Sequence, residues 1–338
     1  MNKKEIFKIL QILTMVIILL VLGVVLFILW KSIRTDKSSK SEDVIAKFGV
    51  LNTPIEENIP NAINSTLKAE VSGLEISDIV YKIDQDSEFF PSNELSESIA
   101  EQINLNLSEN KDNNLYFTNG NGDTILSYND NTKIIFLGVF PPITELNTSI
   151  TNEDEFEEIA KRKLKELNLW PYNNNYSTSY KYYFSSGYEY SETNSADNSN
   201  MIGINFKQNV FDIPLFGNDT DDGEIEVVID SNQRILRISY SYRPINTKNT
   251  SNYPLISLDT AISKIENKKG ELISSVETEI ELKTEEFTIN EIDMSYRINF
   301  NNQQYLQPVY IFKGIDNNNQ SITILVPAIE DTYLQSSN

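Results

Sequence analysis

The longest apolar run of the chain covers residues 9–30, which begin with Ile9, end at Trp30 and contain no charged side chain. At 1.5 Å per residue, a helix of this length measures about 33 Å, enough to cross a hydrocarbon core of roughly 30 Å. The run is too long for a cleavable signal peptide, and Lys31 follows it directly. We therefore expect an uncleaved single-pass membrane anchor, an extracytoplasmic body, and a polar stalk over residues 31–45.

Three later segments carry the apolar period of an amphipathic helix, and they cover residues 93–107, 152–169 and 258–269. The second has acidic residues at its start and basic residues towards its end, an order that complements the helix dipole. The third follows Ser257, a favourable N-cap residue. We expect each helix to bury its apolar stripe, which in the second helix includes Phe156.

Short runs rich in β-branched and aromatic residues, bounded by Asn- and Gly-rich turns, follow each predicted helix. They predict an α+β fold in which an N-terminal transmembrane helix precedes repeated units of one helix and an antiparallel meander. The expected parts are the N-terminal tail with its anchor (residues 1–30) and the stalk (31–45). Three α+β units follow (46–150, 151–250 and 251–330), and a short tail (331–338) ends the chain.

The charge is distributed unevenly along the chain. Its 338 residues contain 28 Lys and Arg against 49 Asp and Glu, which gives a formal net charge of −21 at pH 7. Residues 1–40 hold seven basic and two acidic side chains, whereas the remainder holds 21 basic and 47 acidic ones. A body this acidic is repelled by a phosphate backbone, so nucleic acid is not expected as a partner.

The chain contains neither cysteine nor histidine. Disulfides, thiolate catalysis, the Ser-His-Asp triad and the usual zinc sites are therefore excluded, and no cofactor is expected. Ser65 and Lys68 match the S-x-x-K spacing of penicillin-recognising enzymes, but the K-T-G string is missing and the segment does not have the pattern of a helix start. We expect no enzymatic activity.

Several strings in the C-terminal half are similar to a known family. They are IGINFKQNVFDIPLFG and GEIEVVIDSNQRILRISYSYRPI, followed by ISLDTAISKI, YLQPVYIFKG and ITILVPAIED. Over about residues 151–330 the chain thereby resembles PepSY-like domains and YycI-type single-pass regulatory membrane proteins. Where the family has a glycine turn, this chain has Ser231-Asn232-Gln233, and we expect Asn232 to take the glycine's role. The resemblance implies an extracytoplasmic module that binds and restrains another protein, such as a sensor kinase or a peptidase.

An acidic turn between the strings IPLFG and IEVVID concentrates hard oxygen ligands of the kind that calcium prefers. The weak candidates for such a cation site are Asp219, Asp221, Asp222 and Glu224. An EF-hand alignment fails because Ile229 falls where a bidentate Glu is needed. A solvated Asp-Gly turn that leads into a strand explains the same residues, so we expect no metal.

Tyrosines gather between residues 176 and 190, on both sides of the turn sequence Ser185-Ser186-Gly187. This pattern predicts a hairpin, because aromatic residues favour strands. Rings on its surface can anchor a protein partner or stack on sugars. We choose Tyr182 and Tyr188 as candidate partner-binding residues.

Two functions stay open at this point. The first is a membrane-anchored extracytoplasmic regulatory module that binds another envelope protein by contact and catalyses no reaction. The alternative is a cell-surface structural or glycan- or ligand-binding module.

Overall fold

The structure is a computed structural model that describes the chain in segments. These are residues 46–59, 63–68, 77–140, 150, 152–171, 176–185, 190–193, 195–210, 213–217, 224–273, 286–298, 303–316 and 319–335. The expected membrane segment, residues 9–30, and the expected stalk, residues 31–45, lie outside them. In the part of the chain that is described, no helix is both long and apolar enough to cross a membrane.

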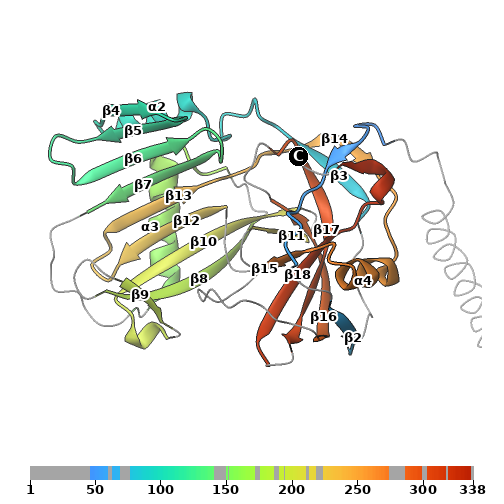
Figure 1. Cartoon of the computed structure of the whole chain (residues 1–338). Helices are drawn as coiled ribbons and strands as arrows, with labels where there is room; N and C mark the ends of the chain where they lie inside the picture. The colour runs from blue at the N-terminus through green and yellow to red at the C-terminus, as the bar shows by residue number, and fades with distance from the viewer. Residues whose placement is uncertain are drawn as a thin grey trace, which may run out of the picture. The chain divides into compact units, whose positions relative to one another are not determined.

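Hydrogen bonds connect seventeen described strands, among which two sheets can be distinguished. The first sheet has nine antiparallel strands in the order β4-β5-β6-β7-β13-β12-β10-β8-β9 (Figure 1). In that order the strands are Asn106–Lys111, Asn114–Thr118, Thr124–Asn129, Ile134–Val139, Ile235–Tyr240, Ile225–Asp230, Met201–Val210, Tyr176–Ser185 and Tyr190–Thr193.

Two helices, α2 (Asn93–Gln102) and α3 (Glu153–Glu166), pack on the same face of the first sheet. Figure 1 shows α3 running behind β10 and β12. The apolar stripe predicted for α3 is buried, with Phe156 only 6% exposed. The shared core joins helix residues to every second side chain of the central strands, as the alternation of side chains along a strand requires.

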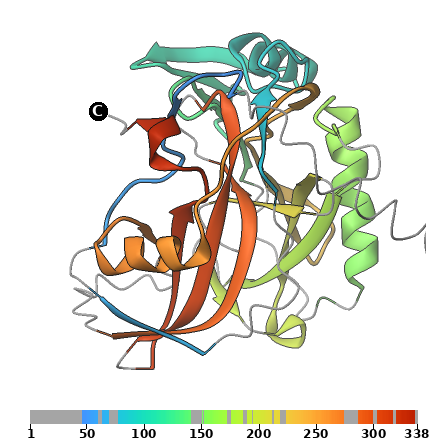
Figure 2. The same cartoon turned by 90° about the vertical axis from the view of Figure 1, so that its right-hand side faces the viewer.

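The second sheet is built around β17 (Tyr305–Asp316), which pairs with β16, β18 and β3. The other strands are β2 (Asn64–Leu67), β3 (Ile79–Ile83), β11 (Ile213–Phe216), β14 (Ile245–Asn252), β15 (Glu271–Ile273), β16 (Glu286–Arg297) and β18 (Ser321–Pro327). Figure 2 shows α4 (Leu258–Glu266) lying across the strands of this sheet, with which it shares a core. A parallel pair of β1 (Leu51–Asn52) and β19 (Leu334–Gln335) and two 3-10 turns, Ala196–Asn198 and Asp331–Tyr333, complete the described elements.

The predicted α+β fold class is wrong, because strands dominate the described residues: nineteen strands accompany three α-helices. The helix-and-meander units do not close separately. β7 pairs with β13, and β3 pairs with β14 and β17, so sheet pairing crosses the boundaries expected at residues 150 and 250. Joining the meanders supplies partners for backbone groups that an isolated meander would leave open at its edges. Residues 46–338 accordingly cluster as one compact unit.

All three predicted helices are confirmed, although each ends before its predicted last residue, at Gln102, Glu166 and Glu266, and α2 is shortened most. It ends at Gln102, and Asn104 then takes a left-handed conformation with φ 58°, a conformation that commonly ends helices. The chain continues directly into β4. Leu107, which was expected to belong to the helical stripe, therefore lies on an edge strand and is 56% exposed.

Candidate functional site

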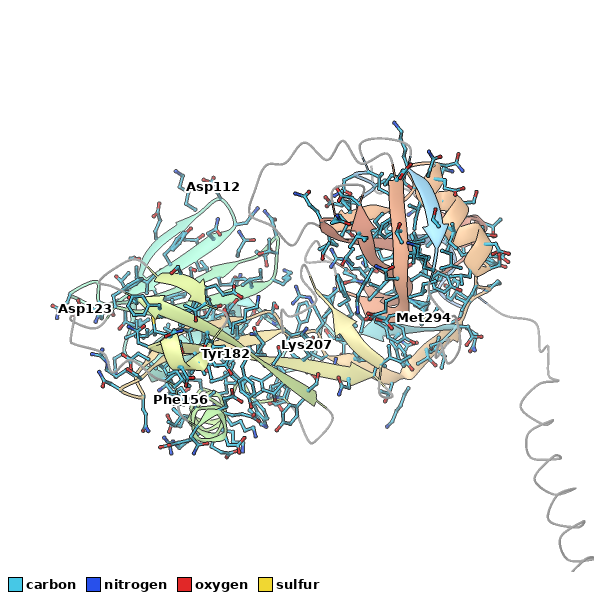
Figure 3. The ribbon with its side chains drawn as sticks, turned by 90° about the horizontal axis from the view of Figure 1, so that it is seen from below. Asp112, Asp123, Phe156, Tyr182, Lys207 and Met294 are labelled. Carbon is cyan, nitrogen blue, oxygen red and sulfur yellow. The ribbon has the colours of Figure 1, made fainter. Side chains whose placement is uncertain are left out.

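Tyr182, one of the two predicted contact residues, lies on the helix-covered side of β8. Its ring packs against the core beneath α3, and its hydroxyl donates a hydrogen bond to Glu153. Burial, together with the Glu153 carboxylate, raises the pKa of Tyr182 to about 12. Figure 3 shows the residue near Phe156 of α3. The structure thus gives Tyr182 a part in holding α3, while Tyr188 lies outside the described residues; a partner-binding role for either stays a prediction.

Of the four candidate cation ligands, the structure describes only Glu224. Asp219, Asp221 and Asp222 lie outside the described residues. Glu224 is buried, and its carboxylate accepts hydrogen bonds from the backbone N–H groups of Gln208, at 2.9 Å, and Arg243, at 3.1 Å. Among the described side chains no group of three potential metal ligands occurs. Glu224 therefore joins two backbone segments of the first sheet.

Ser65, which was considered as a nucleophile because of its S-x-x-K spacing, lies within strand β2. The mechanism suggested by that spacing needs the serine at the start of a helix, where its hydroxyl and the lysine lie one helical turn apart. On a strand the two side chains are three positions apart and point to opposite faces. The described geometry therefore offers no support for the penicillin-recognising arrangement.

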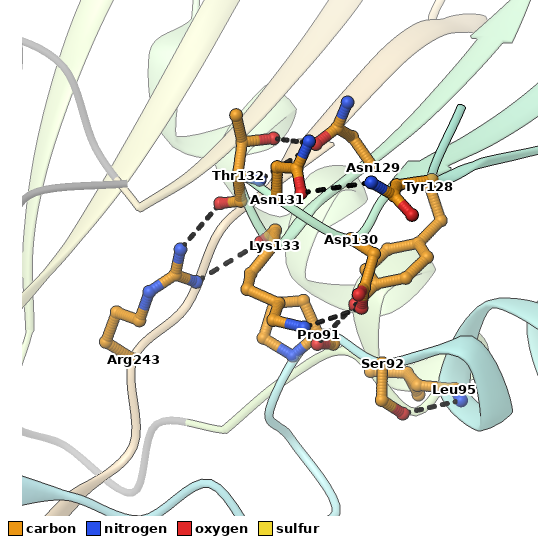
Figure 4. Close-up of polar contacts among 11 residues, drawn as sticks. Pro91, Ser92, Leu95, Tyr128, Asn129, Asp130, Asn131, Thr132, Lys133 and Arg243 are labelled. Carbon is orange, nitrogen blue, oxygen red and sulfur yellow. Dashed lines mark hydrogen bonds and ion pairs between the residues drawn. The ribbon is translucent and has the colours of Figure 1, made fainter. Parts of the chain in front are cut away.

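Arg243, just beyond β13, ties the turn between β6 and β7 to the rest of the first sheet (Figure 4). Its guanidinium donates to the carbonyl oxygens of Thr132, at 2.9 Å, and Ser241, at 2.8 Å, and lies 5.6 Å from the centre of the Phe90 ring. Burial lowers the pKa of Arg243 to about 10, so the group stays cationic at neutral pH. Several carbonyl acceptors take the place of water around this buried charge.

The same turn holds a smaller polar cluster around Asp130. Its carboxylate accepts hydrogen bonds from the Tyr128 hydroxyl, at 2.9 Å, and from the Lys133 ammonium, at 2.6 Å. Figure 4 shows Asp130 between these two side chains. The hydrogen bond from Lys133 holds the pKa of Asp130 below its ordinary value of 3.8. This cluster stabilises the turn and leaves the functional site to be sought on another surface.

The opposite face of the first sheet, which we call the open face, is the best candidate for a functional surface. Side chains alternate along β10, so Ile202, Ile204 and Phe206 enter the core while Gly203, Asn205 and Lys207 point the other way. The register then assigns to the open face Tyr116, Ile125, Ser127, Ile134, Phe136, Gly138, Ser177, Ser179, Lys181, Tyr183, Met201, Gly203, Asn205, Lys207, Glu226, Val228, Asp230, Arg237 and Ser239, and the Phe140 ring lies near Gly138. Among the described helices, α2 and α3 lie on the other face and α4 packs on the second sheet. The residues of the open face on β10 are nevertheless buried, with Asn205 2% and Lys207 8% exposed, so the accessible part of this face is its β5–β7 end.

One end of the open face carries an aromatic patch, defined as Tyr116, Phe136 and Phe140. Phe140 is 54% exposed and Tyr116 is 37% exposed. The Phe136 and Phe140 rings lean over Gly138, where an added Cβ would come within 3.0 Å of Phe136 and 3.3 Å of Phe140. A glycine at this position thus lets the two rings lie close to the sheet. Exposed aromatic groups of this size are typical anchors of protein interfaces.

The central strands β12 and β13 carry, on the open face and beside the aromatic patch, a fixed polar network around Glu226. Its carboxylate binds the Arg237 guanidinium at 2.7 Å and accepts a longer hydrogen bond, 3.3 Å, from the Tyr183 hydroxyl. Burial and the negative charge of Glu226 raise the pKa of Tyr183, so its hydroxyl is a neutral donor at physiological pH. An added Cβ at Gly203 would lie 3.0 Å from the Tyr183 ring and 3.2 Å from Glu226, which shows that both side chains lie over this glycine.

The sequence did not predict the open face, although the alternation of side chains along one of its strands was visible. The alternation in MIGINFKQNV separates Gly203, Asn205 and Lys207 from the core residues of the same strand. The aromatic patch and the polar network become neighbours only through the pairing of β7 with β13. No local pattern in the sequence indicates that pairing.

Comparison with known proteins adds little to this description. No protein-family model matches the chain, and no curated protein matches it. An uncharacterised protein of Eubacterium rectale shares 14% sequence identity with it, at a TM-score of 0.41, over 82% of this chain and 90% of its own. The C-terminal domain of Bacillus megaterium YpeB is a distant structural neighbour with 10% identity and a TM-score of 0.30, over 71% of this chain and 94% of its own.

Proposed function

We propose that this protein is a non-catalytic module that binds another protein through the open face of its first sheet. The observation that carries the proposal is the aromatic patch, in which Phe140 and Tyr116 are exposed beside the fixed Glu226–Arg237 pair. Apolar anchors that adjoin well-ordered polar groups are typical of protein interfaces. The absence of histidine and cysteine from the chain removes the commonest general base and the strongest nucleophile.

The expected regulatory role belongs to the same proposal. The resemblance of residues 151–330 to PepSY-like and YycI-type proteins supports a module that restrains an envelope protein on the extracytoplasmic side of the cell membrane. The location rests on the sequence of residues 9–30, which lie outside the described residues. An interface on a sheet face suits such a role, because α2 and α3 already stabilise the sheet from its other side.

Site-specific cross-linking tests the interface. A photoreactive phenylalanine analogue replaces Phe140 in the full chain, and a second variant carries it at Val50, another exposed apolar position. We expect one envelope protein to be cross-linked from position 140 and not from position 50. The identified protein, once purified, should bind the wild-type chain and lose binding to the Tyr116→Ser/Phe140→Ser variant, while a Val50→Ser/Leu67→Ser control binds normally. Equal cross-linking from both positions would contradict the proposal.

The aromatic patch also favours one alternative, a glycan-binding surface, because flat exposed rings stack on sugars. The same variants distinguish the two functions. One outcome would favour glycan binding over protein binding. In it, purified cell-wall material retains the full chain but not the Tyr116→Ser/Phe140→Ser variant, and no protein is cross-linked from position 140.

A further inference from the structure

Strand β4 forms one edge of the first sheet and is exposed along its whole length. In the described part of the chain it pairs with β5 alone, and Figure 1 shows it at the end of the sheet. All six of its residues are exposed, and Leu107 is 56% exposed. An edge strand carries backbone N–H and C=O groups that can pair with a further strand. β4 is therefore a surface of a different kind from the aromatic patch.

The hairpin between β4 and β5 determines which backbone groups point outward. Asp112 and Asn113 form its two-residue turn, with φ 51° and 64°. The flanking residues Lys111 and Asn114 then form a hydrogen-bonded pair. Because hydrogen-bonded and non-hydrogen-bonded pairs alternate along antiparallel strands, the N–H and C=O groups of Asn110 point away from β5.

The charge around this edge indicates which kind of strand fits it. Residues 93–113, from α2 to the turn after β4, hold one exposed basic side chain, Lys111, and five exposed acidic ones. The acidic side chains are those of Glu94, Glu97, Glu101, Glu109 and Asp112. A second copy of this chain would bring the same negative charge to the edge and be repelled, whereas a basic segment would be attracted.

We propose that an extended, basic segment of the partner protein adds to the first sheet as a strand beside β4. The inference rests on the proposed function, because it names how the partner at the open face is held and which chemistry its contact segment has. An apolar side chain of that segment meets Leu107 on the helix-covered side of the sheet. Basic side chains meet Glu109, which lies opposite Tyr116 of the aromatic patch. Main-chain hydrogen bonds supply affinity, and the alternating side chains supply specificity.

Two features of β4 restrict what can pair with it. The register shifts between Leu107 and Glu109, and the Ser108 hydroxyl between them donates to the Tyr116 carbonyl at 3.0 Å. Bulges and charged side chains keep an edge from pairing indiscriminately. A strand that adds here must therefore match both the charge and the register of β4. The same features would suit an edge that pairs with nothing, and measurement of backbone protection separates the two.

Hydrogen exchange followed by mass spectrometry tests strand addition on the full chain. The probes are two blocked hexapeptides, one of alternating lysine and valine and one of alternating glutamate and valine, which differ in the sign of their charge. We expect the lysine peptide, at about ten times its Kd, to slow exchange of the outward amides in the fragment covering residues 106–111 by about tenfold. The glutamate peptide should have no effect. β9, the other edge of the sheet, serves as an internal control and should not respond.

Two variants separate the backbone contribution from the charge contribution. Asn110→Pro removes an outward N–H and leaves the hydrogen bonds to β5 in place, because proline is tolerated on the outer side of an edge strand. We expect it to weaken lysine-peptide binding about tenfold with an unchanged melting temperature. Glu109→Lys, which keeps the backbone, should weaken binding in a salt-dependent way and decides the test should Asn110→Pro not fold. Glu57→Lys, the same change at an exposed position before β2, should bind normally.

The outcomes that overturn the inference are equally specific. They are exchange in residues 106–111 that neither peptide slows, or that both peptides slow equally. Exchange that slows as the concentration of the chain alone rises would also overturn it, because a second copy would then occupy the edge. Partner cross-linking from position 140 with unchanged affinity in Asn110→Pro refutes this inference alone. Lysine-peptide binding at β4 without any partner cross-linked from position 140 refutes the proposed interface on the open face alone.

Discussion

The two faces of the first sheet are built from the same strands and serve different purposes. On β10, Ile202, Ile204 and Phe206 form the core beneath α3, whereas Gly203 and Asn205, on the other side, make no contribution to that core. The covered face is continuous and apolar. The open face combines exposed rings at its β5–β7 end with an ion pair and a small buried cluster of Tyr183, Met201 and Val228. The difference shows that most of the core is built on one side of the sheet, which leaves the composition of the exposed β5–β7 end free to meet a binding function.

The largest effect is expected on the covered face, at Phe156. Phe156→Ala removes a buried ring from the contact between α3 and the sheet and leaves a cavity. The free energy of unfolding should fall by about 3–5 kcal/mol, measured by chemical denaturation. A change below about 0.5 kcal/mol would show that the ring does not contribute to the core.

Arg243 should come next, because its loss leaves carbonyl oxygens of the β6–β7 turn without a donor. Arg243→Met, which keeps much of the side-chain volume, should reduce the free energy of unfolding by about 2–4 kcal/mol. The control is Lys313→Met, which breaks a partly exposed pair with Glu291 and should cost about 1 kcal/mol or less. Similar losses for the two variants would mean that burial of Arg243 is irrelevant.

Tyr182 and Phe140 allow the two faces to be compared directly. Tyr182→Phe removes the hydroxyl that donates to Glu153 and should lower stability by about 1 kcal/mol, with partner binding intact. Phe140→Ser should change stability by less than about 0.5 kcal/mol, and partner binding should be lost. Denaturation curves and binding isotherms of both variants check this, and the reverse result would move the interface to the helix side.

The smallest effect concerns pH and the Asp130 cluster. The pKa of Asp130 is lowered in the folded state, so its stabilising contribution is present at neutral pH. That contribution is lost as the pH falls below about 4 and through the folded-state pKa. Asp130→Asn should therefore melt below the wild type at pH 7, and the gap should close in acid. A gap that stays constant with pH would exclude this carboxylate as its source.

Local features of the fold were predictable, because their signals lie within a few residues. Ser257 caps α4 as expected, and Ser92 caps α2 in the same way, since each side chain accepts from a nearby backbone N–H. The turn between β12 and β13 forms as well, although the left-handed residue is Gln233, with φ 63°, and not Asn232. The residue that takes the left-handed conformation can thus differ by one position. In this turn the Asp230 carboxylate fixes the backbone by accepting hydrogen bonds from the N–H groups of Asn232 and Arg234.

Long-range features were not predictable, and the candidate site depends on them. Glu224 was a candidate cation ligand in the sequence, yet in the structure its carboxylate accepts hydrogen bonds from backbone N–H groups of β10 and of the segment after β13. Tyr182 was expected to contact a partner, but it lies on the side of β8 that α3 covers. Which face of a strand is covered depends on the packing of a helix distant in sequence, and a period of two cannot decide between the faces.

The pairing of β7 with β13 also has a consequence for folding kinetics. It places Leu137 opposite Ile238 and joins β4–β7 to the strands that follow α3. Each group of strands can form from contacts between neighbours in sequence, whereas this seam requires closure of a loop of about 100 residues, whose entropic cost is met late. We therefore expect the pairing of β7 with β13 to form in the slow step of folding. Before that step the edges of both strands are unpaired, and the chain is then most prone to aggregate.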